Sequence, residues 1–419
     1  MSQRHTSSSD IDQQFVQIEA LATRETAFEK SPFSTETPAC QALKLLHLEL
    51  AYPQMIGSRQ SVLSENAGHQ RAFLGPADNS GASRSGRATV TAGSPDARIG
   101  FVGDVMLGRG VNDRWAAHNP IAVWGSARER LQSLSGLVIN LECSISDRGR
   151  PHSEKAFNFR ATPEFAKTAL TDVNVTLAAL ANNHILDFGE PALRDTLVHL
   201  DDVDITHAGA GVDRESAFDP AITTVDGLTV AMLSLTDQYS QYAATSGPGT
   251  AFATLDPSDS TTRSLVSAAI ATAQRADADL VVASLHWGAN YETEPSETYQ
   301  AFAHWLVDSG VDVIHGHSAH ILQGVEVYRG RPILYDTGDF VDDYIDTPGY
   351  ANKQSAIFEL VIDGGRLDRL AVVPTKIVDC AVELADDTAT TACQRLRERS
   401  GAFGTTIEDD GERLNISLS

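Results

Sequence analysis

The feature that most constrains this chain is a group of three histidines that follows a short apolar run. Residues 311–314 have the composition of a buried strand, and His315, His317 and His320 come within six residues of its end. A buried strand that ends in a Gly-His turn is where an α/β protein presents ligands, at the carboxyl edge of a parallel sheet. Imidazole is the commonest metal ligand and the usual proton carrier near neutral pH. The alternative interpretation is a polar loop with histidines by chance, and similar strand endings upstream speak against it.

Strand-like and helix-like segments alternate along the chain. Further buried strands are predicted at residues 99–102, 137–141, 175–180, 228–235 and 280–285. Helices are predicted at residues 121–133, 164–170, 190–200, 261–275 and 297–309. This alternation indicates a layered α/β fold with a mainly parallel central sheet, or sheets, flanked by helices. Beyond residue 344, apolar segments at 356–362 and 367–373 flank a glycine turn and predict antiparallel strands, before a helix at 388–399 and a strand at 413–418.

Most of the predicted strands end in a side chain that can bind a metal ion. In chain order these endings are Asp104, Glu142, Asn182 or Asn183 with His184, and His286, before the histidines described above. A single ending of this kind is common as a helix cap or a core residue. Because parallel strands end at the same edge of a sheet, five such endings predict one shared site.

Carboxylates, amides and imidazoles without cysteine suit Mn, Fe, Zn or Mg. Two such ions about 4 Å apart clamp a phosphoryl group and activate a water molecule, so one or two ions per chain are expected. A bridging carboxylate is then needed, and Glu142 is placed to serve. His184 is placed to protonate a leaving oxygen.

Three cationic side chains near these motifs predict an anionic substrate, either a small molecule or a polymer. They are Arg109, between two glycines, and Lys155 and Arg160, which flank two phenylalanines in the sequence EKAFNFR. Each taken alone is as readily a surface charge. We assign Arg109 to the catalytic group with His184, and Lys155, Arg160 and Asn182 to substrate binding.

Composition limits the partners and the domain organisation. The chain has 419 residues and a formal charge of −24, which argues against a nucleic-acid partner. A membrane-spanning run and a signal segment are not expected, which favours a location in the cytoplasm or at the membrane periphery. Residues 1–95 are rich in Ser, Thr and Gly and predict a flexible extension, with a short helix at 39–52. The main domain is expected over residues 96–380, with a C-terminal helix and tail, residues 381–419, packed on it.

Six motifs occur in an order that resembles the CapA family, which is named for a poly-γ-glutamate capsule biosynthesis protein and is related to the calcineurin-like metallophosphoesterases. They are GDVMLGR (103–109), NLECSIS (140–146), KAFNFRATPE (155–164), ANNHILDFG (181–189), HWGANYETEP (286–295) and GHSAHILQGVEVYRGRPILYDTGDF (316–340). The similarity covers residues 97–375 and implies a metallophosphoesterase-like fold. It also implies catalysis by His184 and metal ligation by Asp104, Glu142, Asn183, His286, His317 and His320.

The sequence departs from the phosphoesterase pattern in the part that would hold one of two metal ions. Met106 occupies the position of an expected histidine, and His320 follows His317 by three residues where the pattern has two. The Gly-Asn-Phe that is usual in CapA proteins is here Gly-Asp-Phe, which adds the carboxylate of Asp339 without an assigned role. One of the two metal sites is therefore expected to be weak or missing.

Two functions remain open at this point. The first is a metal-dependent hydrolase of a phosphoester or of another anionic bond, such as a γ-glutamyl amide. The second is a non-catalytic accessory subunit of a poly-γ-glutamate synthesis or export complex. A third function, binding of a glutamate polymer, is disfavoured because the polymer and the chain are both negatively charged and repel each other. An accessory subunit of this kind usually needs a membrane anchor or a signal segment. Because neither is expected here, the enzyme is the favoured function.

Overall fold

The computed structural model describes residues 96–418. The predicted flexible extension and the predicted helix at 39–52 lie outside the described residues. Among residues 96–418, none of the helices combines the length and apolar character needed to cross a membrane.

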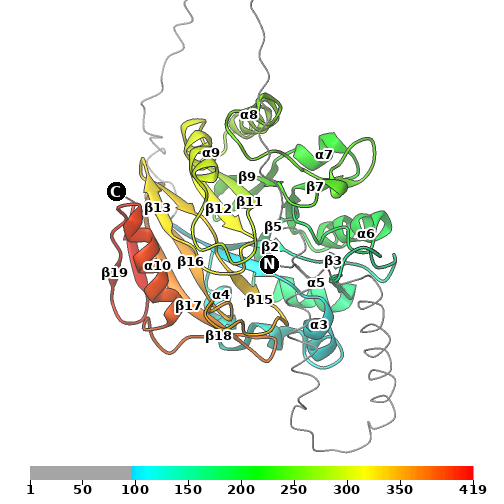
Figure 1. Ribbon diagram of the computed structural model, residues 1–419, viewed down its shortest axis with the longest axis horizontal. Helices are drawn as coiled ribbons and strands as arrows, with labels where there is room; N and C mark the ends of the chain where they lie inside the picture. Colours follow the sequence, from blue (N-terminus) through cyan, green and yellow to red (C-terminus); the bar gives the residue numbers. More distant parts are fainter. Residues whose placement is uncertain (1–95, 419) are drawn as a thin grey trace, which may run out of the picture. The chain divides into compact units, whose positions relative to one another are not determined.

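Two β-sheets form the centre of the described region (Figure 1). The larger has the order β19-β20-β17-β16-β1-β2-β5-β6, with β15 paired to β1 and β18 paired to β17. The smaller has the order β13-β14-β12-β11-β9-β8. Strands β1, β2, β5 and β6 are mutually parallel, as are β9, β11, β12 and β14. The C-terminal strands pair antiparallel, as predicted.

The larger sheet consists of β1 (Ala97–Val105), β2 (Gly136–Leu141), β5 (Val175–Ala179), β6 (Thr206–Ala208), β15 (Asp339–Val341), β16 (Gln354–Asp363), β17 (Arg366–Val378), β18 (Ala381–Leu384), β19 (Glu408–Asp409) and β20 (Leu414–Ser417). The smaller consists of β8 (Ala221–Val225), β9 (Leu228–Thr236), β11 (Leu280–His286), β12 (Val313–His317), β13 (Val325–Tyr328) and β14 (Arg331–Leu334). Two short ribbons pair β3 (Ser144–Ile145) with β4 (Arg160–Ala161) and β7 (Ala210–Gly211) with β10 (Gly249–Thr250).

Helices pack around the two sheets. They are α3 (Arg109–Trp115), η1 (Pro120–Ala127), α4 (Arg128–Gln132), α5 (Pro163–Asp172), α6 (Glu190–Asp201), α7 (Arg214–Phe218), η2 (Ser240–Tyr242), α8 (Ser260–Arg275), α9 (Glu297–Asp308) and α10 (Thr391–Ala402). Buried residues of α5 and α6 pack on the larger sheet, and those of α8 and α9 on the smaller one. The C-terminal helix α10 packs through Ala392, Cys393 and Leu396 into the core that the two sheets share.

The inner faces of the two sheets meet in a common core. Phe101 and Val138 of the larger sheet pack in one cluster with Met232, Val282 and Val313 of the smaller sheet. The alternate residues of the same strands face the helices. Both faces of these strands are therefore buried, which explains why they read as continuous apolar runs in the sequence. The result is a four-layer arrangement of helix, sheet, sheet and helix.

One predicted helix, at residues 121–133, is wrong as a single element. The structure has a 3-10 segment η1 followed by the short helix α4, with Gly125 at φ +42° between flanking helical residues. A β-carbon at Gly125 would lie 2.4 Å from the carbonyl oxygen of Val382 in β18. The close passage of β18 therefore requires the glycine, and the left-handed glycine interrupts the helix.

Candidate metal centre

The predicted site residues gather where the parallel strands of both sheets end. Asp104 of β1 lies in register with Asn140 of β2 and with Asp339 of β15. In the smaller sheet, His286 of β11 lies in register with His317 of β12. The two sheets thus bring their carboxyl ends together, and the site spans both.

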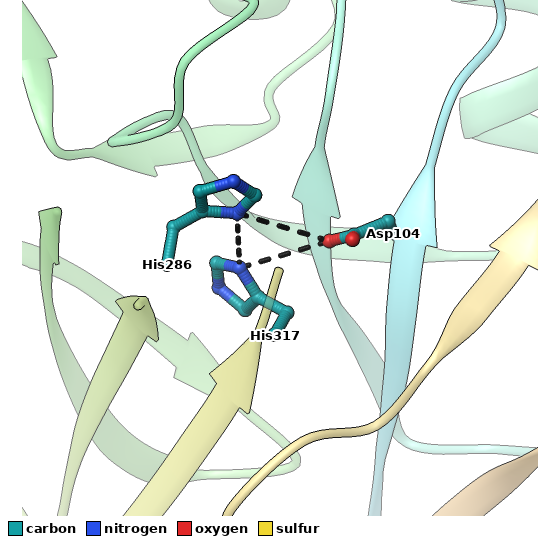
Figure 2. Close-up of side chains that lie close together, drawn as sticks. All are labelled: Asp104, His286 and His317. Atoms are coloured by element: carbon teal, nitrogen blue, oxygen red, sulfur yellow. Dashed lines mark hydrogen bonds and ion pairs between the residues drawn. The ribbon is translucent and has the colours of Figure 1, made fainter. Parts of the chain in front are cut away.

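One cluster combines a carboxylate with two imidazoles (Figure 2). The Nδ1 atoms of His286 and His317 are 2.9 Å apart, and they lie 4.0 and 3.7 Å from Oδ1 of Asp104. Ser284 contacts Nε2 of His317 at 2.9 Å, and Asn140 donates to Oδ1 of Asp104 at 2.6 Å. These contacts from outside the cluster fix the ring and the carboxylate, as partners of metal ligands commonly do.

A second cluster adjoins the first and is rich in carboxylates. It comprises Asp104, Glu142, His320 and Asp339, whose ligand atoms all lie within 4.8 Å of one another. Nδ1 of His320 lies 2.7 Å from Oδ1 of Asp339 and 3.3 Å from Oδ2 of Asp104. All four residues are buried. Asp104 contributes one oxygen to each cluster and so joins them.

Several buried oxygens of the second cluster lack a hydrogen-bond partner among the described residues. They are Oδ2 of Asp104, both carboxylate oxygens of Glu142, and Oδ2 of Asp339. Buried polar atoms are nearly always paired, so an unpaired group of this size calls for a ligand. Oxygen and nitrogen donors in this arrangement fit a divalent cation.

The pKa values of the second cluster reflect crowded negative charge. Burial, together with the charge of Asp104, raises the pKa of Glu142 well above its ordinary value, and burial likewise raises the pKa of Asp339. Burial acts to lower the pKa of His320, but the charge of Asp339 and the close contacts with the carboxylates of Asp104 and Asp339 outweigh it and raise that pKa well above its usual range. A proton on His320 thus supplies positive charge of the kind that a bound cation would supply.

Asn183, which was predicted to be a ligand, contacts His286 at Nε2, whereas Nδ1 of His286 faces Asp104 and His317. Oδ1 of Asn183 is 3.1 Å from Nε2 of His286. Oε1 of Glu142 lies 4.0 Å from the same His286 nitrogen and 3.9 Å from Nε2 of His184. Glu142, a member of the second cluster, therefore also lies near His286 and His184.

His184 is held from its far side by Asp187. Nδ1 of His184 lies 2.6 Å from Oδ2 of Asp187, and the ring stacks on Phe159 with centroids 3.8 Å apart. Asp187 also accepts hydrogen bonds from the backbone N–H of Phe159 at 2.8 Å and from the hydroxyl of Tyr242 at 3.2 Å. These contacts orient the imidazole so that its Nε2 atom faces Glu142.

Two of the residues that were predicted to bind substrate make hydrogen bonds and ion pairs within the framework of the site. Lys155 forms an ion pair with Asp187 at 2.5 Å and donates to the backbone oxygen of Asn183. The side-chain amide of Asn182 donates to Leu141 at 2.9 Å, and its oxygen accepts from the backbone N–H of His184 at 3.0 Å. Both side chains are engaged by the protein, so neither offers a free group to a substrate.

Arg109 and Arg160 lie at the edge of the site. Arg109 pairs with Asp343 at 2.5 Å, and its guanidinium lies about 5 Å from the ring of Phe159. The guanidinium of Arg160 lies 4.1 Å from the ring centroid of Phe188. Both arginines line a cavity of about 290 Å³. This arrangement leaves Arg160 as the more available cation, because Arg109 already faces a carboxylate.

Sequence reasoning missed Asp187 and left Asp339 without a role. Asp187 follows His184 by three residues in the motif NNHILD, and this spacing was the available signal. Asp339 has no local signal, because its approach to Asp104 depends on the pairing of β15 with β1.

Comparison with known proteins places the chain in a family. The family model described as bacterial capsule synthesis protein PGA_cap matches residues 98–344. The chain belongs to this family. A relative from Mycobacterium tuberculosis, named as a probable polyglutamine synthesis accessory protein, is 33% identical over 364 residues, which cover 75% of this chain and 94% of the relative.

Two proteins named CapA are also similar to this member of the capsule synthesis family. The capsule biosynthesis protein CapA of Bacillus anthracis is 29% identical over 280 residues, which cover 66% of each chain. The PGA biosynthesis protein CapA of Bacillus subtilis is 28% identical over 279 residues, which cover 66% of this chain and 70% of the relative. The family predicted from the sequence motifs is confirmed, and the four-layer fold is consistent with a metallophosphoesterase-like architecture.

Proposed function

We propose that this capsule synthesis family member is a metal-dependent hydrolase that cleaves a phosphoester or another anionic bond, such as a γ-glutamyl amide. The observation that carries the proposal is the set of buried oxygens of Asp104 and Glu142 that have no hydrogen-bond partner among residues 96–418. Leaving such oxygens buried and unpaired costs several kcal/mol in stability. A cation bound among them offsets that cost and gives the cluster a chemical purpose.

The ligand set fits one or two divalent ions of the kind predicted, namely Mn, Fe, Zn or Mg. The residues that would hold them include Asp104, Glu142, Asn183, His286, His317 and His320. Such ions polarise the bond to be cleaved and make water a better nucleophile at neutral pH. Ligands that are already buried and held by Ser284 and Asn140 need little rearrangement to bind.

His184 is the residue that we assign to proton transfer. Its Nδ1 atom is engaged by Asp187, so its Nε2 atom faces Glu142 and the two clusters. Burial lowers the pKa of His184 to about 4, so the ring is neutral near pH 7 and Nε2 is a free acceptor. Nε2 is placed to accept the proton that the attacking water gives up and to deliver that proton to the leaving oxygen, so the ring would act first as a base and then as an acid.

Positive charge at the edge of the site supports an anionic substrate. Arg109 and Arg160 line the same cavity, which Asp113 and Asp147 also line, and Arg109 shares its charge with Asp343. We propose that the anionic part of the substrate lies along these two side chains, with its scissile bond over the clusters. Conservative replacement of Arg160 by glutamine is then expected to raise KM more than it lowers kcat.

Elemental analysis of the purified protein, combined with hydrolysis of a generic chromogenic phosphodiester in the presence of Mn²⁺, tests the proposal. Bound metal with turnover supports it. The His184→Ala variant is expected to keep its metal and to lose turnover, because His184 transfers protons and is not assigned as a ligand. Loss of metal in that variant would contradict the division of roles.

The accessory-subunit function is the second candidate, and the name of the Mycobacterium tuberculosis relative favours it. In that case the clusters would serve to stabilise the fold, and the chain would act through a poly-γ-glutamate synthesis complex. Metal-loaded protein that hydrolyses neither phosphodiesters nor γ-glutamyl amides, yet unfolds when the metal is removed, would support this alternative over the enzyme.

A further inference from the structure

The second cluster lacks a ligand where the phosphoesterase pattern has a histidine. Met106 holds that position, and it is fully buried. Its sulfur accepts a hydrogen bond from the backbone N–H of Gly108 at 3.2 Å. A thioether is a soft donor that suits copper better than Mg or Mn, and this one is already engaged. Met106 therefore does not complete a site for a hard divalent ion.

Strand β15 brings Asp339 to the same place from a distant part of the chain. β15 pairs in parallel with β1, and Asp339 lies in register with Asp104. The two strands approach closely, since a β-carbon at Gly103 would lie 1.7 Å from the carbonyl oxygen of Gly338. The backbone N–H of Asp104 also donates to that oxygen at 2.9 Å. The close approach depends on glycine at position 103 and fixes Asp339 beside Asp104.

The carboxylate of Asp339 points into the cluster and is only partly satisfied there. Its Oδ1 lies 2.7 Å from Nδ1 of His320, whereas its Oδ2 is buried and has no hydrogen-bond partner in the described part of the chain. The side chain is 1% exposed, so solvent does not compensate. Glu142 contributes two more unpaired oxygens to the same space. Among the described residues, His320 lies against two of the cluster's carboxylates, those of Asp104 and Asp339.

We propose that Asp339 is a ligand of a second divalent-cation site, formed with Asp104, Glu142 and His320, and that it replaces the histidine missing at position 106. This inference rests on the proposed function in one respect, since both take the two clusters to be metal sites. It reverses the expectation that the change at Met106 leaves one site weak or missing. The chain then carries two sites, joined through the two oxygens of Asp104.

The two sites differ in the ions that they favour. The second site offers three carboxylates and one imidazole, whereas the first combines one carboxylate with the imidazoles of His286 and His317. Hard cations such as Mg²⁺ and Mn²⁺ favour oxygen ligands, and Zn²⁺ accepts imidazole readily. The second site therefore takes Mn²⁺ or Mg²⁺ in preference to Zn²⁺, and the first site takes Zn²⁺ more readily than the second does.

Metal titration of the full chain tests the assignment without any substrate. Metal-free protein is titrated with Mn²⁺ by calorimetry, and the number of bound ions is counted by elemental analysis. The wild type is expected to bind two ions. Asp339→Asn keeps the shape of the side chain and is expected to weaken one site by about 100-fold or more, because losing even an outer partner of a ligand costs about 10–100-fold.

Asp342→Asn is the matched control. Asp342 is equally buried, lies three residues further along and also has one oxygen without a hydrogen-bond partner among the described residues, but its other oxygen pairs with Lys353 and it is outside both clusters. This variant is expected to bind two ions. If Asp339→Asn does not fold, His320→Gln is expected to lose the same site. If Asp339→Asn folds, the double variant Met106→His with Asp339→Asn is expected to regain the site.

Three results distinguish this inference from the proposed function. The role of Asp339 would be overturned if Asp339→Asn bound two ions with unchanged affinity, or if Asp342→Asn lost metal affinity to the same extent. Either result would hold whether or not the wild type is an enzyme. Two ions that depend on Asp339, without hydrolysis of any substrate, would uphold the inference and refute the hydrolase. A wild type that binds one ion would overturn the second site alone.

Discussion

Substitution of Lys155 distinguishes two roles for this residue, a structural role in the framework of the site and the substrate-binding role predicted from the sequence. Its side chain is 9% exposed, and its partner Asp187 is fully buried. Burial lowers the pKa of Lys155, and the charge of Asp187 acts in the opposite direction. Lys155→Met keeps the length of the side chain and removes the charge. The exchange therefore tests the ion pair with little change in packing.

The expected cost follows from the burial of the carboxylate that is left behind. Removing one partner of a buried ion pair typically costs about 3–5 kcal/mol. Asp187 keeps three hydrogen-bonding partners, namely His184, Tyr242 and the backbone of Phe159. We therefore expect Lys155→Met to lower the free energy of unfolding by about 3 kcal/mol, at the low end of that range.

Chemical denaturation measures this difference, and Lys167→Met provides the control. Lys167 pairs with Asp202 at 3.6 Å, and both side chains are exposed to solvent, at 29% and 51%. An exposed pair contributes about 0–1 kcal/mol, so the control should unfold almost as the wild type does. A Lys155→Met variant of wild-type stability whose KM is strongly raised would refute the framework role and restore the substrate contact.

Three further predictions concern the metal ligands, acid stability and strand packing. His286→Ala is expected to lose bound metal, which elemental analysis would detect; unchanged metal content would remove His286 from the ligand set. Burial lowers the pKa of His315 to about 4, below its ordinary value of 6.5. The stabilisation that comes from keeping this ring neutral in the folded state is therefore complete above about pH 6.5 and is lost as the pH falls through about 4. That contribution is about 3 kcal/mol at most. In metal-free protein, the free energy of unfolding of His315→Asn should therefore depend less on pH between about 4 and 6.5 than that of the wild type. Denaturation at a series of pH values measures this difference. Gly103→Ala should lower the free energy of unfolding by about 3 kcal/mol or more, because the added β-carbon would clash with the carbonyl oxygen of Gly338. Gly401→Ala, on α10 with open space around it, should be neutral or slightly stabilising. Equal effects of the two substitutions would refute the packing argument.

Much of the site could be predicted because its ligands follow apolar strands directly. Asp104, Glu142 and His286 each come at or next to the end of a buried run, and parallel strands end at one edge. The structure brings these residues together with His317 and His320. The C-terminal hairpin was equally predictable, since the glycine turn at 364–365 specifies a tight connection between β16 and β17.

The remaining parts depended on long-range packing that local sequence does not encode. The role of Asp339 arises from the pairing of β15 with β1, which brings together residues more than 200 positions apart. The sequence motif predicted Lys155 as a cation that binds substrate and gave no sign that the fold buries it against Asp187. The break at Gly125 comes from the passage of β18. The sequence also indicated parallel strands without indicating how they divide between two sheets that share a core.

Anomalous X-ray scattering from crystals grown with Mn²⁺ tests the central claim most directly, because it locates the ions as well as counting them. We expect one peak among Asp104, His286 and His317, and a second among Asp104, Glu142, His320 and Asp339. Well-ordered crystals of Mn²⁺-saturated protein without a peak at either position would contradict a metal centre at the carboxyl ends of these strands, and with it the metal-dependent hydrolase.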